Sequence, residues 1–372
     1  MRFETKVVHA GLCSDKTGAV APPIHLSTTF ERDPASEPIG ADTYIRESNP
    51  TQTQLENALA PLEGGEAALA FASGMAAGVT AIQSLPPGSH IILPDDAYYT
   101  YRTAFDDFFS RWGFEVSVAD MADPTNVRAA LRPKTRLIWV ETPSNPLVKV
   151  VDIAAVCEIA RQAGATTMLD NTWATPALQR PLDLGVDIAL HSTTKYFGGH
   201  SDVMGGALIF KRKDELYEGC KHTLHVLGAV PSPFNSWLVM RGIRTLACRM
   251  RVHSDNGMAV AAGLEGHTAL SQIHYPGLKN DPGHAVAKKQ MSGFGGMMSI
   301  RVKGGRDAAM KVVSRVKLFT RATSLGGTES LIEHRASSEG PGSKTPQDLL
   351  RLSIGLEHHD DLLADLKQAL AG

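Results

Sequence analysis

The sequence predicts an α/β protein with a mostly parallel central sheet, followed by a smaller α+β domain. From residue 62 onward, apolar runs of five or six residues alternate with stretches that have the periodicity of amphipathic helices. Such runs are typical of parallel strands that are buried on both faces. After residue 233 the pattern changes to long helical text, followed by strands and helices in closer succession. We therefore expect an N-terminal arm over 1–60, a large domain over 61–240 and a small domain over 241–372.

The arm is predicted from composition. The first 60 residues are rich in Pro, Thr and Ser, as in APPIHLSTTF and YIRESNPTQ. Such a composition favours irregular, extended chain over a packed unit. We expect this segment to lie over another surface rather than to fold by itself.

The elements of the two domains follow in order along the chain. Strands are expected at GEAALAF (65–71), HIILP (90–94), RLIWVE (136–141), ATTMLDN (165–171), VDIALHS (186–192) and GGALIF (205–210), with a helix over 152–163. Phe234 to Leu264 reads as helical text with arginine along one side. The small domain is expected to contain elements at 295–302, 306–315 and 317–324 and a final helix after residue 358. The paired His358 and His359 are expected at the solvated start of that last helix.

Composition excludes several classes of protein. Of the 372 residues, 43% are hydrophobic and 20% are charged, which is ordinary for a globular protein and excludes long disorder. The net charge of −2, without a basic block, gives no support for a nucleic-acid or anionic-membrane partner. No apolar run reaches the roughly 18 residues of a membrane span. The N-terminal MRFETKVVHAG lacks the hydrophobic segment of a signal peptide, so we expect a cytoplasmic protein.

The four cysteines indicate neither a disulfide framework nor a metal site. Cys13, Cys157, Cys220 and Cys248 are scattered, without a CxxC pair or a His/Cys cluster at metal-ligand spacing. Cys157 and Cys248 lie in apolar helical text and are expected to be buried free thiols. No metal is expected.

Polar residues recur where the predicted strands end. These are Ser73-Gly74-Met75, Tyr98, Glu141 with Ser144-Asn145, Asp170, and the stretch from Ser192 to Lys195. In an open α/β sheet, ligands bind at the carboxyl ends of the strands. One coincidence of this kind would mean little, but five predict a site.

Three of these features together match one cofactor. A helix that begins at Ser73-Gly74 offers free amides and its dipole to a phosphate, although an ordinary helix cap would look the same. Asp170 ends an apolar strand and needs a cationic partner if it is buried, although it could also cap the following turn. Lys195 lies among small polar residues and is followed by two glycines. A lysine without a functional role is unusual in such surroundings, because its long side chain normally extends along the surface to reach water. A lysine, a carboxylate and a phosphate cradle are the parts that hold pyridoxal phosphate (PLP).

A serine hydrolase is the rival interpretation of the same stretch. Ser192-Thr193-Thr194-Lys195 fits SxxK, in which a serine opens a helix and the lysine one turn later activates it. Here two glycines follow Tyr196 almost at once, so little helix is available. No SDN occurs, and the nearest approach to KTG is Lys344-Thr345-Pro346.

Motifs along nearly the whole chain resemble one family. ETPSNP (141–146), DNTWATP (170–176), HSTTKYFGGHSDVMGG (191–206), AVPSPF (229–234) and SLGGTESLIEH (324–334) are similar to those of the cystathionine enzymes. These PLP-dependent transsulfuration enzymes include γ-synthases, γ-lyases and β-lyases. The resemblance implies the fold type I of PLP-dependent transferases, related to aspartate aminotransferase. It also implies homotetramers built from dimers that share their active sites.

The resemblance also implies roles for individual residues. Lys195 would be the Schiff-base lysine and proton shuttle, Asp170 would pair with the pyridine nitrogen, and Tyr98 would stack on the ring and join proton transfer. Arg351 would bind the substrate α-carboxylate with help from Ser324. The residues implied in cofactor binding are Ser73, Gly74, Met75, Tyr98, Asn145, Asp170, Thr172, Ser192, Thr194 and Lys195. Asn145 would lie near the 3-oxygen of the ring and near the substrate. Tyr44 and Arg46 would reach the phosphate from the neighbouring subunit.

The sequence departs from the family pattern at three places. Tyr99-Thr100 replaces a glycine pair after Tyr98, with one residue fewer, which leaves open whether Tyr98 or Tyr99 stacks on the cofactor. Glu47 stands where γ-synthases can carry a second arginine for an acylated homoserine. Thr323 stands where γ-synthases and γ-lyases often carry a glutamate.

The sequence thus predicts a PLP-dependent carbon–sulfur lyase or transsulfuration enzyme that acts on cystathionine or related amino acids. We place the γ-lyase reaction first and keep γ-synthase and β-lyase as alternatives. An aminotransferase of the same fold and a PLP-binding protein without turnover are more remote alternatives. The roles of Arg102, His225 and Thr323 are left open.

Overall fold

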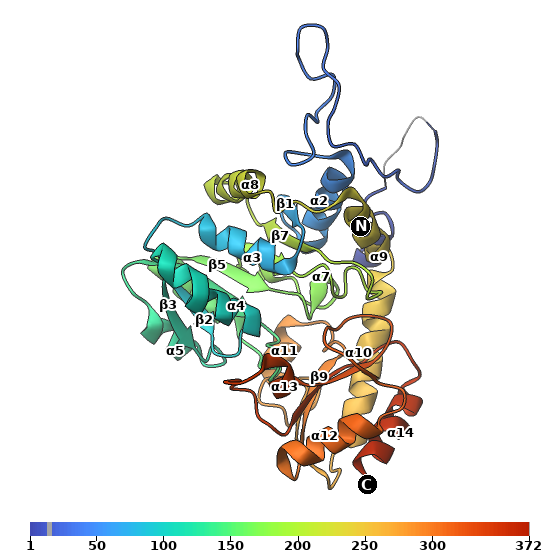
Figure 1. Cartoon of the computed structure of the whole chain (residues 1–372). Coiled ribbons are helices and arrows are strands. Elements are labelled where there is room, and N and C mark those ends of the chain that lie inside the picture. Colours follow the sequence, from blue (N-terminus) through green and yellow to red (C-terminus); the bar gives the residue numbers. More distant parts are fainter. Residues whose placement is uncertain (13–16, 372) are drawn as a thin grey trace.

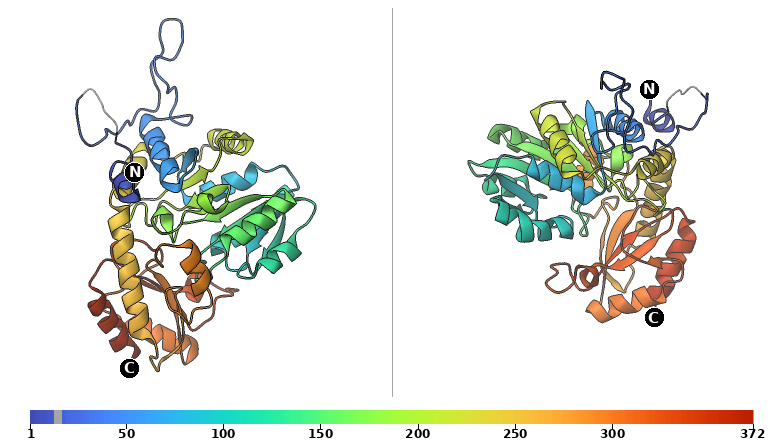
Figure 2. Two further views of the ribbon diagram at one scale, coloured as in Figure 1. Left: turned by 180° about the vertical axis from the view of Figure 1, so that it is seen from behind. Right: turned by 45° about the horizontal axis from the view of Figure 1, so that its top comes forward.

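A computed structural model describes residues 1–12 and 17–371 (Figure 1). The expectation about Cys13 lies outside the described residues. The chain forms two sheets with their covering helices, and an N-terminal segment projects from the part with the larger sheet (Figures 1 and 2). We call them the large sheet (β1–β7) and the small sheet (β8–β12).

The large sheet has seven strands in the order β1-β7-β6-β5-β4-β2-β3. Its strands are β1 (Ala67–Phe71), β2 (His90–Pro94), β3 (Glu115–Ala119), β4 (Thr135–Glu141), β5 (Thr166–Asp170), β6 (Ile188–His191) and β7 (Gly206–Phe210). β7 is antiparallel to both of its neighbours, and the other six strands share one direction. The predicted mostly parallel sheet is therefore present, with one reversed strand.

The sheet is buried on both faces because helices pack against each side. The helices are α1 (Phe3–Val8), α2 (Pro50–Glu63), α3 (Gly74–Gln83), α4 (Tyr99–Ala104), α5 (Pro124–Ala130), α6 (Ile153–Ala163), α7 (Thr175–Leu178), α8 (Glu215–Leu227) and α9 (Pro233–Ile243). Short turns of other helix types follow at Phe105–Phe109, Ser110–Trp112 and Pro181–Leu184. Alternate residues of each strand contribute to opposite cores, as period-two side-chain geometry requires: Val140 joins the core with α2 and α6, and Trp139 joins the core with α3, α4 and α8.

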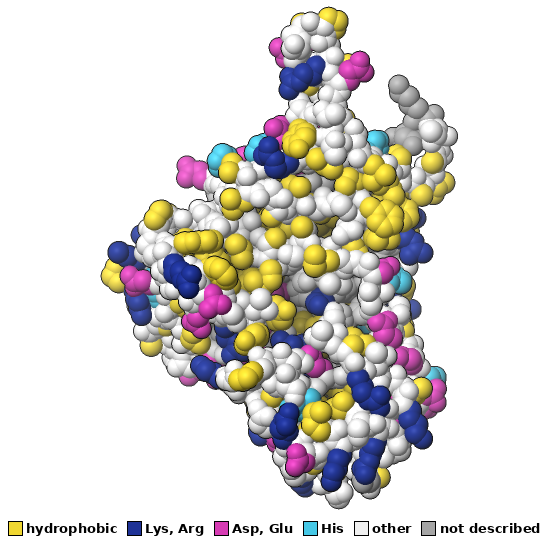
Figure 3. Space-filling view, viewed as in Figure 1, with side chains coloured by type: hydrophobic (Ala, Val, Ile, Leu, Met, Phe, Trp, Pro, Cys, Tyr) yellow, Lys and Arg dark blue, Asp and Glu magenta, His cyan; other side chains and the backbone are white. Residues whose placement is uncertain are grey.

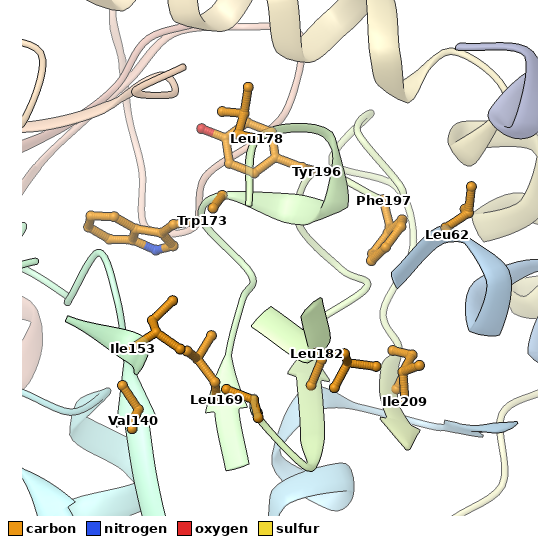
Figure 4. Close-up of a cluster of buried hydrophobic side chains, with 14 of the residues drawn as sticks. Leu62, Val140, Ile153, Leu169, Trp173, Leu178, Leu182, Tyr196, Phe197 and Ile209 are labelled. Carbon is orange, nitrogen blue, oxygen red and sulfur yellow. The ribbon is translucent and has the colours of Figure 1, made fainter. Parts of the chain in front are cut away.

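The loop that carries Lys195 is held by the core that also contains side chains of α2 and α6. Tyr196 and Phe197, which directly follow Lys195, are almost fully buried and belong to the hydrophobic cluster shown in Figure 4. The Phe197 ring packs against His191 at 4.7 Å between ring centres, and the Tyr196 ring packs against His253 at 5.0 Å. Each fully buried aromatic side chain contributes about 1.5–3 kcal/mol through the hydrophobic effect. Packing of the two neighbours therefore fixes the backbone that carries Lys195.

The small sheet has five strands in the order β10-β11-β12-β9-β8. Its strands are β8 (Leu270–His274), β9 (Met297–Val302), β10 (Thr320–Arg321), β11 (Leu331–His334) and β12 (Leu349–Ser353). Helices α10 (Leu246–Leu264), α12 (Gly305–Arg315) and α14 (His359–Leu370) pack with it in a separate core, and α11 (His284–Gln290) and α13 (Arg335–Glu339) complete this part. His358 caps α14 and is exposed, as expected for a solvated helix start.

The long helical stretch forms two helices rather than one. The break between α9 and α10 falls at Arg244 and Thr245. α10 then runs along both parts of the molecule, so it connects the large sheet to the small one (Figures 1 and 2).

Two expectations about cysteines are wrong. Cys248 is exposed, because it lies on the outer side of α10 while Arg249, Met250 and His253 face inward. Cys157 is only half-buried, and Cys220 is buried in α8.

Residues 50–60, which the sequence grouped with the arm, form most of α2 and pack against β1. The segment from 17 to 49 contains only isolated β-bridges, including Thr29 with Tyr44. Across residues 1–12 and 17–371, no helix combines the length and apolar character needed to cross a lipid bilayer.

Candidate active site

A cavity of about 220 Å³ opens between the carboxyl ends of the large-sheet strands and the small sheet. Its lining includes the twelve residues to which the resemblance gave a role in one chain's own site: Ser73, Gly74, Met75, Tyr98, Asn145, Asp170, Thr172, Ser192, Thr194, Lys195, Ser324 and Arg351. The strand ends therefore converge as the parallel sheet predicts.

On the face of the molecule shown in Figure 3, Lys and Arg side chains are interspersed with Asp and Glu, without one continuous patch of a single sign.

The start of α3 provides an anion cradle in one wall. The Ser73 hydroxyl accepts a hydrogen bond from the Ala76 amide at 3.1 Å and so caps the helix. The amides of Gly74 and Met75 make no hydrogen bond within the described part of the chain. A Cβ at Gly74 would lie 2.9 Å from Cβ of Ser192, so a side chain would close the space there. Free amides at a ten-residue helix N-terminus fit a phosphate group.

The hydroxyls of Thr172 and Thr194 already form hydrogen bonds within the chain, whereas that of Ser192 does not. The Ser192 amide donates to Oγ1 of Thr172 at 2.9 Å. Oγ1 of Thr194 donates to the Gly205 carbonyl at 3.2 Å and accepts from the Gly205 amide at 3.0 Å. The Ser192 hydroxyl makes no hydrogen bond to any described residue, which leaves it available to a ligand.

Asp170 ends β5 and directs its carboxylate to the cavity. It accepts a hydrogen bond from the Thr172 amide at 3.0 Å, and it forms no ion pair with the described residues. Burial raises the pKa of Asp170 above its ordinary value. A protonated ring nitrogen would supply the missing cation, so this carboxyl fits the pyridine of PLP.

A buried network lies directly behind this wall. Oε1 of Glu63 in α2 contacts Nε2 of His191 at 2.5 Å and accepts from Nδ2 of Asn171 at 2.8 Å. His191 precedes Ser192, and Asn171 follows Asp170. The network therefore ties the ends of β5 and β6 together and sets the spacing of two cavity residues.

Lys195 lies at the centre of the cavity. Its Nζ donates a hydrogen bond to the Ser324 hydroxyl at 2.7 Å. Burial, together with the nearby guanidinium groups of Arg351 and Arg335, lowers the pKa of Lys195 to about 8. Such a lysine loses its proton much more readily than an ordinary one.

Ser324 connects Lys195 to the arginine on the small sheet. Its backbone carbonyl accepts from Nη2 of Arg351 at 3.0 Å, and its φ of 85° lies in the left-handed region. A non-glycine residue in that region is strained, and such strain clusters at functional sites. Nη1 of Arg351 donates to Oδ1 of Asn145 at 3.1 Å, so one guanidinium is held by both parts of the molecule.

The structure brings Tyr98, and not Tyr99, to the cavity. The Tyr98 amide donates to Oε2 of Glu141 at 2.8 Å, and its ring lies edge-on to Tyr101. Tyr99 lines a different hollow, where Arg102 lies 5.9 Å from its ring centre. The Tyr101 hydroxyl donates to the Gly74 carbonyl at 2.6 Å and thereby supports the start of α3.

Tyr44 and Arg46 do not line this cavity. Tyr44 is 44% exposed, and Nη1 of Arg46 donates to the His225 carbonyl at 2.9 Å. They lie on the N-terminal segment, so the structure does not place them at the site of their own chain.

Sequence reasoning missed a set of charged residues at the small-sheet side of the cavity. Glu333 forms an ion pair with Arg351, and Arg335 contacts both Glu333 and Glu339. Although burial opposes it, the Arg351 guanidinium holds the pKa of Glu333 below its ordinary value. Glu333 lies inside the motif SLGGTESLIEH, but nothing in the motif showed that its side chain meets Arg351.

The parallel sheet, the lysine at its carboxyl edge and the carboxylate behind it define a PLP-dependent enzyme of fold type I. The sequence matches the family described as Cys/Met metabolism PLP-dependent enzyme over residues 4–371. The chain belongs to this family.

Relatives across the full length agree with this assignment. Cystathionine gamma-synthase of Mycobacterium tuberculosis is 48% identical over 373 residues, which cover 98% of this chain and 96% of the relative. Cystathionine beta-lyase of Coxiella burnetii is 42% identical over 378 residues, or 99% and 97% of the two chains. The crystal structure of metB from Corynebacterium glutamicum superposes with a TM-score of 0.97 at 44% identity and covers 100% of this chain and 98% of that one. The predicted fold, the PLP cofactor and the transsulfuration family are thus confirmed.

Proposed function

We propose that this enzyme makes or breaks the carbon–sulfur bond of cystathionine-like amino acids, with Lys195 as its acid–base group. The observation that supports this best is the joint placement of Lys195, Asp170 and Arg351 on one cavity beside the free amides of α3. When bound, pyridoxal phosphate supplies the electron sink that makes the α-proton of an amino acid removable.

The chain offers a binding group for each part of the cofactor. The amides of Gly74 and Met75 and the Ser192 hydroxyl suit the phosphate, with Ser73 and Thr194 supporting the loops around it. The Asp170 carboxylate suits the ring nitrogen, and the Tyr98 ring offers a stacking surface. Asn145, next to Arg351, suits the ring oxygen, and Thr172 holds the Ser192 backbone in place.

Lys195 and Arg351 have different roles toward the substrate, namely proton transfer and binding. Arg351 orients the amino acid by binding its α-carboxylate, in competition with Glu333. Lys195 in its neutral form takes the proton from Cα, and its lowered pKa makes that form accessible near neutral pH. Ser324 holds Nζ in reach.

Three reactions remain to be distinguished, namely γ-replacement, γ-elimination and β-elimination. The relative that is 48% identical is named a gamma-synthase, and this supports γ-replacement over the γ-lyase reaction that we placed first from the sequence. The beta-lyase relative and Thr323, which lines the cavity where a carboxylate would otherwise assist γ-chemistry, keep β-elimination as the alternative.

We further propose that the enzyme acts in the cytoplasm as a homotetramer built from dimers. The exposed segment that carries Tyr44 and Arg46 supports shared sites, because in one chain these residues lie away from the cavity.

Product analysis tests the function. The PLP-loaded enzyme is incubated with L-cystathionine alone, and separately with cysteine and O-succinyl-L-homoserine. Pyruvate with homocysteine means β-elimination, 2-oxobutyrate with cysteine means γ-elimination, and new cystathionine means synthesis. A PLP-loaded enzyme that gives none of these products would overturn the proposal.

A further inference from the structure

Arg335 is a cavity residue that neither the sequence motifs nor the proposed mechanism uses. It is the first residue of α13 and is 5% exposed. It lines the same cavity as Lys195, Tyr98 and Arg351. A buried guanidinium is costly unless its charge and its donors are matched.

The protein matches only part of this guanidinium. Nε of Arg335 donates to Oε1 of Glu339 at 3.2 Å, and Nη1 lies at 3.5 Å from Oε1 of Glu333. Its Cζ lies 5.8 Å from the ring centre of Tyr98. Nη2 makes no hydrogen bond to any residue in 1–12 or 17–371. One end of the fork therefore has no partner among these residues, and Arg335 lines the cavity.

The two carboxylates beside Arg335 are already shared. Glu333 also pairs with Arg351. Glu339 also accepts hydrogen bonds from Ser343 and Thr345, and Arg102 approaches it to 3.8 Å from outside the cavity. Arg335 therefore shares both of its carboxylate partners with other groups, and the unmatched part of its guanidinium suits a carboxylate of a ligand.

We propose that Arg335 determines specificity by binding a second carboxylate at the far end of the substrate, while Arg351 binds the α-carboxylate. The inference rests on the proposed function, since it concerns the same amino-acid site. It names the substrate class as amino acids whose side chain ends in a carboxylate, which includes cystathionine and dicarboxylic esters of homoserine. The planar fork of arginine favours such a group over a neutral end.

Binding of a matched ligand pair tests this without turnover. L-2-aminosuberate and L-2-aminooctanoate have the same length and no leaving group, and they differ in the terminal carboxylate. Calorimetry on the PLP-loaded wild type should show at least about tenfold tighter binding of the dicarboxylate, the range of one charge-assisted contact. Arg335→Gln should remove the preference and leave the affinity for the monocarboxylate within about twofold, and Arg335→Lys should restore part of it.

Arg306→Gln is the matched control, because Arg306 contacts Ser337 of α13 from the exposed side, outside the cavity. This variant should keep the full preference. Equal weakening of both ligands in Arg335→Gln would show a purely structural role and overturn the proposal, as would equal binding of the two ligands by the wild type. Conversion of cystathionine by the wild type is measured in parallel. A chain that prefers the dicarboxylate but leaves cystathionine intact would overturn the proposed function and support the role of Arg335.

Discussion

At the scale of single residues, the site depends on ionisable groups whose surroundings change their chemistry. Asp170 and Lys195 are both partly removed from water, but their pKa values move in opposite directions, up for the carboxyl and down for the amine. Burial disfavours the charged form of each group, so each is prepared to gain or lose a charge when a ligand arrives.

Asp170→Asn should lower kcat by about 100-fold or more, the usual cost of one preorganised electrostatic group. The melting temperature should change little, because the amide still fits beside the Thr172 amide. Asp187→Asn is the control: Asp187 receives hydrogen bonds from the amide and hydroxyl of Thr167 away from the cavity, so this change should affect stability and spare kcat. Unfolding of Asp170→Asn with kcat preserved in the folded fraction would show that the carboxylate is structural.

The capture of PLP by the apoenzyme should depend on pH through Lys195. Only the neutral amine attacks an aldehyde, and its fraction grows as the pH rises through the pKa of about 8. The rate of covalent loading, trapped with borohydride and read by mass spectrometry, should therefore level off above about pH 8 rather than near the ordinary lysine value of about 10.4. In Arg335→Gln the midpoint should move upward, because a neighbouring positive charge is removed. A midpoint near the ordinary value in the wild type would contradict this account.

At the scale of elements, strand ends and one helix start bring the site together. Six predicted strands of the large sheet are present, because continuous apolar runs such as HIILP identify buried parallel strands. β3 was not among them, since it lies at the sheet edge and is largely exposed, without an apolar run. Glu333 and Arg335 were missed for another reason. Glu333 contacts Arg351 and Arg335 contacts Tyr98, so these contacts join separate parts of the chain, and no local sequence pattern encodes them.

The proposed phosphate binding by the start of α3 can be tested by adding one methyl group at Gly74. Gly74→Ala should weaken PLP binding by at least about tenfold, because the new Cβ would lie 2.9 Å from Cβ of Ser192 and enter the cradle. PLP affinity is measured by fluorescence titration of the apoenzyme. Gly219→Ala, inside α8, is the control, since its Cβ would meet nothing closer than 3.8 Å. It should keep PLP affinity and raise stability by up to about 1 kcal/mol through helix propensity. Unchanged PLP affinity in Gly74→Ala would exclude the cradle.

At the scale of the whole molecule, the N-terminal segment and the cavity suggest that one chain is incomplete by itself. The segment between residues 17 and 49 projects from the part with the large sheet (Figure 1). If the segment of one chain reaches the cavity of its partner, as the shared sites proposed above require, each site depends on two chains.

Mixing two inactive variants tests this arrangement. Lys195→Ala lacks the acid–base group, and Arg46→Ala lacks the proposed phosphate contact from the neighbouring subunit. In a mixed dimer, the site with an intact Lys195 would receive an intact Arg46 from its partner. Co-refolded variants should therefore recover about a quarter of wild-type activity, whereas each alone stays low. Activity that never exceeds the average of the two separate variants would show that sites are not shared.

The cavity lies on the seam between two sheets, with Asn145 and Lys195 on one side and Ser324 and Arg351 on the other. A ligand that contacts residues on both sides links the two parts of the molecule. A ligand present at 100 times its dissociation constant adds about 2.7 kcal/mol of stability. The resistance of this enzyme to heat and to proteases should therefore increase with the concentration of the amino acids that bind in the cavity. The amount of folded enzyme in a cell would then depend on the concentration of its own substrates.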